Sequence, residues 1–200
     1  MILSVSKGGR VVEVGALPPG DAGISATVAG MQAAVDHAVY GPDAAAVFDA
    51  ARTALSMVAG GDAGRAVYAF CSDGFRYRAD PPGVELVRLP AGLLSERLAS
   101  GVALCDCDDR AVLGCSLVWA LRLLGAAPGV SPVLVTVGRR ARGFGGRFEH
   151  VFWGLIRDGA PLSPVNVIPS DPQERVPFGE WGRAVSRVKL WRLSPSDPYR

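Results

Sequence analysis

The sequence predicts an α+β protein, because an almost wholly apolar helix is followed by runs that are typical of β-strands. Residues 107–124 carry apolar side chains on nearly every face, which indicates a central and buried helix. Residues 132–137 (PVLVTV) are mostly β-branched and predict a buried strand. Residues 150–156 and 162–168 flank the turn sequence Asp158-Gly159, so they predict a β-hairpin.

The composition predicts a single domain over residues 1–200. The chain is 49% hydrophobic and 20% charged, which are values of a globular protein rather than a disordered one. Its net charge of +2 argues against a nucleic-acid partner. Arg122 interrupts the most apolar stretch, which leaves residues 111–121 too short for a bilayer core of about 30 Å. The first residues lack a signal-peptide pattern, so we expect a cytoplasmic protein with no membrane partner.

The cysteine and histidine counts indicate neither a disulfide framework nor a metal site. The four cysteines are Cys71, Cys105, Cys107 and Cys115, and they contain no C-x-x-C pair of the kind found in zinc sites. Cys71 and Cys115 fit apolar helical patterns and are interpreted as buried hydrophobes. We therefore predict no metal and no cofactor, and expect a reducing compartment.

Turn and cap signals divide the rest of the chain into short elements. Apolar runs over residues 2–14 flank Ser6-Lys7-Gly8-Gly9 and predict an N-terminal hairpin. The hairpin and helices of residues 1–60 are expected to stand beside a core at about 62–170. The other expected elements are helices at 26–40, 43–59, 63–72 and 93–98, an extended piece at 75–78, and an ordered stretch at 181–193.

The run Asp106-Cys107-Asp108-Asp109 starts the apolar helix and is the first candidate for chemistry. Asp106 is a natural N-cap, and Asp109 is its capping-box partner. Cys107 then holds the first helical position, where the helix dipole favours a thiolate and free backbone N–H groups can hold an oxyanion. The neighbouring aspartates oppose the thiolate, so an imidazolium partner is needed. The alternative is that Cys107 is a small buried hydrophobe.

His150 is the candidate general base, because it starts a strand directly after the Gly/Arg-rich loop 138–147. That loop is expected to be a solvated connection, with a lid or a surface for an anionic partner as the alternative. A third residue should orient the imidazole. The predicted hairpin brings Asn166 back beside His150, so Asn166 is the first choice and Asp171, in the following loop, is the reserve. The alternatives are that His150 has a purely structural role and that Asn166 hydrogen-bonds to the backbone at a strand end.

Several stretches of the chain follow the motifs of one family. Residues 105–113, with Leu123-Leu124-Gly125, resemble a G-D-C-D-D-x-A-x-L…L-G segment, and residues 148–152 resemble an F-S-H-V-Y strand. Residues 75–86 resemble an I-R-Y-x-x-D-P-x-G-x-E stretch. The motifs are those of transglutaminase-like, papain-fold cysteine proteins, and the last is typical of the branch encoded among bacteriophage and prophage genes. The resemblance covers roughly residues 40–170.

The resemblance implies a papain-like fold, in which a central helix carrying the cysteine packs on an antiparallel sheet. It also implies a protease or transamidase that acts on amide or isopeptide bonds, with Cys107 as nucleophile and His150 as base. Two departures stand out: Cys105 replaces the family's glycine, and Asn166 replaces the orienting aspartate. The expected partner is a protein or peptide substrate. The alternative is a non-catalytic phage structural or assembly protein, associated with the virion and with other phage structural proteins.

Overall fold

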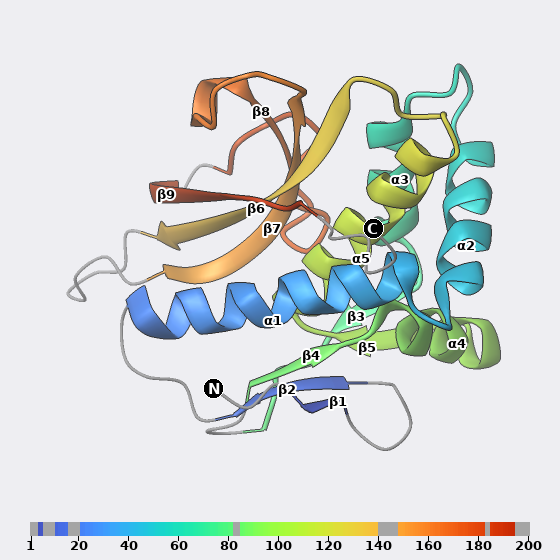
Figure 1. Ribbon diagram of the computed structural model, residues 1–200, viewed down its shortest axis with the longest axis horizontal. Helices are drawn as coiled ribbons and strands as arrows, with labels where there is room; N and C mark the ends of the chain where they lie inside the picture. Colours follow the sequence, from blue (N-terminus) through green and yellow to red (C-terminus); the bar gives the residue numbers. More distant parts are fainter. Residues whose placement is uncertain are drawn as a thin grey trace.

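The described residues form an α+β structure with five helices and a four-stranded antiparallel sheet in the computed structural model (Figure 1). The structure describes residues 4–5, 11–15, 21–81, 85–139, 148–182 and 185–194. The helices are α1 (Asp21–Tyr40), α2 (Ala44–Ser56), α3 (Ala63–Ser72), α4 (Pro90–Ser100) and α5 (Cys107–Leu123). The strands are β1 (Ser4–Val5), β2 (Val11–Gly15), β3 (Phe75–Tyr77), β4 (Glu85–Arg88), β5 (Ala103–Cys105), β6 (Val130–Arg139), β7 (Phe148–Arg157), β8 (Val167–Ser170) and β9 (Val185–Arg192).

The large sheet has the strand order β8-β7-β6-β9, and every neighbouring pair is antiparallel. A second sheet has the order β1-β2-β4, and β3 and β5 form a short parallel pair. Helix α1 runs between the two larger sheets in Figure 1. The pairing of β1 with β2 confirms the predicted N-terminal hairpin, although its turn residues 6–9 lie outside the described residues.

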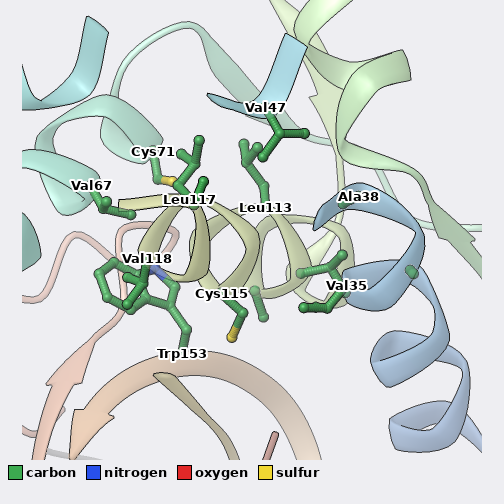
Figure 2. Packing of buried hydrophobic residues seen from close by; sticks show 14 of the residues in the cluster. Val35, Ala38, Val47, Val67, Cys71, Leu113, Cys115, Leu117, Val118 and Trp153 are labelled. Carbon is green, nitrogen blue, oxygen red and sulfur yellow. The ribbon is translucent and has the colours of Figure 1, made fainter. Parts of the chain in front are cut away.

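Helix α5 is central because its side chains are apolar on every side. All of its residues from Asp108 to Val118 are buried, including the charged ones at its start. Figure 2 shows α5 in the middle of the core, with Val35 of α1, Val47 of α2 and Trp153 of β7 around it. The N-terminal helices α1 and α2 therefore share one hydrophobic cluster with the central helix.

Helix α5 and β7 approach closely at Gly114. A Cβ atom on Gly114 would lie 2.3 Å from both Cδ1 and Nε1 of the Trp153 indole. Trp153 is fully buried, so the ring has no solvent to move into. The absence of a side chain at position 114 therefore sets the distance between the helix that carries Cys107 and the strand that carries His150.

Most of the predicted elements are present. Helix α3 has the predicted bounds, α5 ends one residue before its predicted end, and the run 132–137 lies within β6. Helix α1 starts at Asp21, earlier than predicted, and α4 is longer than the predicted 93–98. No helix within the described ranges is long and apolar enough to cross a membrane.

The predicted strand over residues 162–168 is wrong. Residues Pro164–Asn166 form a 3-10 turn, and β8 starts only at Val167. Proline fixes its own φ and lacks the N–H that a strand would donate, so Pro164 starts a turn instead of continuing a strand. The hairpin partner of β7 is therefore shorter than predicted and lies further along the chain.

Candidate active site

Asp106 and Asp109 form the predicted capping box at the start of α5. The Asp106 carboxylate accepts a hydrogen bond from the Asp109 backbone N–H at 3.3 Å, and the Asp109 carboxylate accepts one from the Asp106 N–H at 3.3 Å. The other Asp109 oxygen accepts the backbone N–H of Arg88 at 2.6 Å, which ties β4 to the helix start. Cys107 is thereby held at the first position of α5.

The three aspartates at the helix start are capping groups rather than a metal site. Carboxylate oxygens of Asp106, Asp108 and Asp109 lie within 4.8 Å of one another, so their geometry alone would suit a cation. However, both oxygens of Asp109 and one oxygen each of Asp106 and Asp108 accept backbone N–H groups.

His150 and Asp171 form a buried hydrogen-bonded pair. The Nε2 atom of His150 lies 2.9 Å from Oδ2 of Asp171, and both side chains are more than nine-tenths buried. The other Asp171 oxygen accepts the backbone N–H of Glu174 at 3.2 Å, which fixes the carboxylate. With Nε2 bound to Asp171, Nδ1 is the ring nitrogen left for a proton acceptor.

Asn166 does not lie beside His150. Its side-chain amide donates to the Pro161 carbonyl at 2.9 Å, and the residue is exposed. The cause is the strand register: β8 pairs Val167 with Ile156 and Ser170 with Trp153. Asn166 therefore sits at the far end of β7, whereas Asp171 follows the end of β8 that points toward His150. The choice of Asn166 over Asp171 is corrected in favour of the reserve.

Cys107 and His150 line the same cavity, whose volume is about 330 Å³. Strand β8 pairs with β7 only from Trp153 onward, so the backbone of Val151 has no β8 partner on that side. The Val151 backbone N–H is one of the groups that lower the pKa of the Cys107 thiol. Because Val151 follows His150 directly in β7, the thiol and the imidazole belong to the same corner of the cavity. No hydrogen bond joins the Cys107 and His150 side chains, both of which the structure describes.

The thiol of Cys107 is not a ready-made thiolate. Burial raises the pKa of Cys107 to about 12, and the charges of Asp106 and Glu85 add to this rise. The hydrogen bond from Val151 acts in the other direction but is outweighed. The helix N-terminus therefore does not make Cys107 a thiolate by itself, which agrees with the expectation that a partner is needed to remove its proton.

Two features of this site escaped the sequence analysis. Glu85 starts β4 and lines the cavity; it is the glutamate of the motif at residues 75–86, but the sequence analysis gave it no role in the site. Arg110 is buried on α5 and its guanidinium lies 3.7 Å from the Cys105 sulfur. Cys105 is thus a buried partner of Arg110, at the position where the resembling family has glycine.

Cys71, Cys105 and Cys115 are buried, whereas Cys107 is partly exposed. Of the four thiols, Cys107 is thus the one that a reagent or substrate can reach. Comparison with known proteins gave no matching family model, no matching curated protein and no matching solved structure.

Proposed function

We propose that the chain is a cysteine-dependent acyl-transfer enzyme that acts on amide or isopeptide bonds. Cys107 is the nucleophile, His150 the general base, and Asp171 the residue that orients His150. The observation that carries the proposal is the buried hydrogen bond of 2.9 Å between Asp171 and His150, whose side chain shares the lining of one cavity with Cys107. A nucleophile, a base and an orienting acceptor are the elements that such chemistry needs.

In this proposal His150 acts as a neutral imidazole in the free enzyme. Nε2–H donates to Asp171, and Nδ1 accepts the proton of the Cys107 thiol as the sulfur attacks the substrate carbonyl. The Cys107 backbone N–H, at the first position of α5, contributes to the oxyanion hole. His150 then gives the proton to the leaving amine, and the thioester is resolved by water or by a second amine. Hydrolysis and transamidation differ only in this last step.

The raised pKa of Cys107 favours proton transfer during the attack over a thiolate–imidazolium pair formed beforehand. A thiol with a pKa of about 12 is protonated in neutral solution, so its reactivity depends on the base that removes its proton. In this proposal the reaction at neutral pH therefore requires His150 to remove the proton of the Cys107 thiol.

The transglutaminase-like resemblance supports the same assignment. The central helix with Cys107 at its start, packed on an antiparallel sheet, is what a papain-like core would have. Asp171 supplies the carboxylate that the resemblance lacked at Asn166. We also propose a phage or prophage origin, on the strength of the motif at residues 75–86, with a protein or peptide as the substrate.

A second candidate function is a non-catalytic structural or assembly role in a phage particle, with the same fold as an interaction module. The observation in its favour is the raised pKa of Cys107, which is also what a purely structural thiol would have. The two candidates differ in whether His150 controls the reactivity of Cys107.

The test is the rate of Cys107 alkylation by iodoacetamide across pH, located by peptide mass spectrometry. We expect Cys107 to react first among the four cysteines, and Cys107→Ser to abolish that label. His150→Ala should slow the labelling near neutral pH by at least about tenfold. His37→Ala, which removes the other histidine, is the matched control and should leave the rate unchanged. Equal rates in wild type and His150→Ala at every pH would favour the interaction module.

A further inference from the structure

Carboxylates dominate the polar part of the cavity beside Cys107. Four acidic residues line it: Glu85, Asp106, Asp108 and Glu149. Among the described residues of its lining, none is a lysine or an arginine. Asp108 is only 2% exposed, and its Oδ2 atom has no donor. Within the described part of the chain the cavity therefore holds carboxylates without a cation, and buried carboxylates are costly without a cationic or donor partner.

We propose that this cavity is a subsite for a positively charged side chain of the substrate, with Glu85 as the residue that binds its ammonium or guanidinium group. The proposal rests on the proposed function in one respect, namely that Cys107 is the reacting residue. It adds a substrate class: peptides that carry a lysine-like or arginine-like side chain next to the carbonyl that Cys107 attacks.

Glu85 is the best-placed acceptor because it is half-buried and, among the residues that the structure describes, has no cation beside it. In that part of the chain its one hydrogen bond comes from the Thr27 hydroxyl at 3.3 Å, which occupies one carboxylate oxygen. Burial raises the pKa of Glu85, and Asp106 and Asp80 raise it further. Glu96 provides the contrast: Arg88 lies 2.6 Å away, and despite the opposing effect of burial the pKa of Glu96 is lowered. A bound cation would lower the pKa of Glu85 in the same way as Arg88 lowers that of Glu96.

The apolar side of the cavity fits the stem of a long basic side chain. Ile24, Val28 and Met31 lie one turn apart on α1 and line the cavity together with the carboxylates. Lysine and arginine pack their methylene groups against apolar surface while the charged head stays with polar groups. A small inorganic cation would use the carboxylates but leave this wall without a function. The two kinds of surface together therefore favour an organic cation.

The test compares two thiol reagents of similar size and opposite charge on Cys107. The cationic reagent is 2-(trimethylammonio)ethyl methanethiosulfonate, and the anionic one is 2-sulfonatoethyl methanethiosulfonate. Each rate is divided by the rate of the same reagent with N-acetylcysteine amide. We expect the cation to be favoured by roughly tenfold at low salt, and the preference to shrink as salt is added.

Glu85→Gln should reduce the preference for the cation several-fold. Both reagents react with the same thiolate, so a change in the pKa of Cys107 cancels in the ratio of their rates. Glu180→Gln is the matched control, because Glu180 is exposed and does not line the cavity. A ratio near one in the wild type, or a ratio that Glu85→Gln leaves unchanged, overturns the proposal.

A second measurement separates this proposal from the proposed function. Isothermal titration of Cys107→Ala with N-acetyl-lysine amide or N-acetyl-norleucine amide needs no reactive thiol. Binding of the lysine derivative alone, lost in Glu85→Gln, supports the cationic subsite even where His150 does not control Cys107. Equal heats from the two compounds, or binding of Mg²⁺ with none of the lysine derivative, overturn it.

Discussion

Replacing Gly114 with alanine should destabilise the fold and disable the site together. The added Cβ atom would lie 2.3 Å from Cδ1 and Nε1 of Trp153, whereas a carbon–carbon contact needs about 3.5 Å. Helix α5 or strand β7 must therefore move by about 1.2 Å. Because Trp153 is three residues from His150 on β7, the movement carries the base away from Cys107.

The expected loss of stability follows from overpacking a rigid core. Inserting a methyl group into a well-packed interior costs about 1–3 kcal/mol, and the better helix propensity of alanine returns about 1 kcal/mol at most. The 2.3 Å contact with a fully buried ring places the cost near the upper end of that range, so about 2 kcal/mol remains after the return. For a chain of this size, that loss lowers Tm by roughly 4–8 °C.

The assay combines thermal unfolding with the rate of Cys107 alkylation at neutral pH. We expect a lower Tm and, in the fraction still folded, a slower reaction. Gly182→Ala is the matched control, since its Cβ would lie 3.6 Å from Val176 Cγ2, its nearest contact in the described part of the chain, which is an ordinary contact distance. An unchanged Tm would refute the argument that Gly114 sets the spacing. A lower Tm with an unchanged alkylation rate would refute the link between that spacing and the site.

Three further predictions test single residues. Asn166→Ala should leave the alkylation rate of Cys107 unchanged, whereas Asp171→Ala should lower it, because Asp171 and not Asn166 contacts His150. Equal losses of rate in the two variants would contradict this assignment. Asp106→Asn keeps an N-cap acceptor but removes a charge that raises the pKa of Cys107, so the alkylation curve should move to lower pH; a shift to higher pH would contradict it. Burial raises the pKa of Asp109 from 3.8 to about 7, so the folded state holds a proton that the unfolded state has lost. Thermal stability should therefore fall as pH rises from about 4 to 7, and Asp109→Asn should flatten that slope; an equally steep slope in the variant would speak against it.

Local signals predicted the elements that hold the nucleophile. The N-cap at Asp106, its partner Asp109 and the glycine at 125 mark both ends of α5, and each is a short-range pattern. The apolar composition of α5 also predicted its central place. These features depend on residues within a few positions of each other, which a sequence displays directly.

The orienting residue was harder to predict because it depends on strand register. The sequence analysis extended a strand over residues 162–168 and so preferred Asn166. Pro164 is the signal that was underweighted, since it removes a backbone donor from that run. Because β8 starts only at Val167, its far end lies at Ser170, and the residue that follows it, Asp171, contacts His150.

The cavity could not be predicted from the sequence at all. It combines side chains of α1, β4, the start of α5, β6 and β7, which only tertiary packing brings together. Glu85 was quoted as part of a motif, but its neighbours Thr27 and Asp106 come from distant parts of the chain. The same packing covers much of Cys107, which remains partly exposed, and this partial burial outweighs the effect expected from the helix dipole.

The most direct test of a Cys107–His150–Asp171 acyl-transfer site is the formation of a covalent acyl-enzyme. Intact-mass spectrometry after brief exposure to p-nitrophenyl acetate should show one acetyl group per chain, which peptide mapping assigns to Cys107. The adduct should be absent in Cys107→Ser and His150→Ala, and should form more slowly in Asp171→Asn. Acetylation spread over lysines and the N-terminus, with Cys107 unmodified or equally modified in His150→Ala, would contradict the central claim.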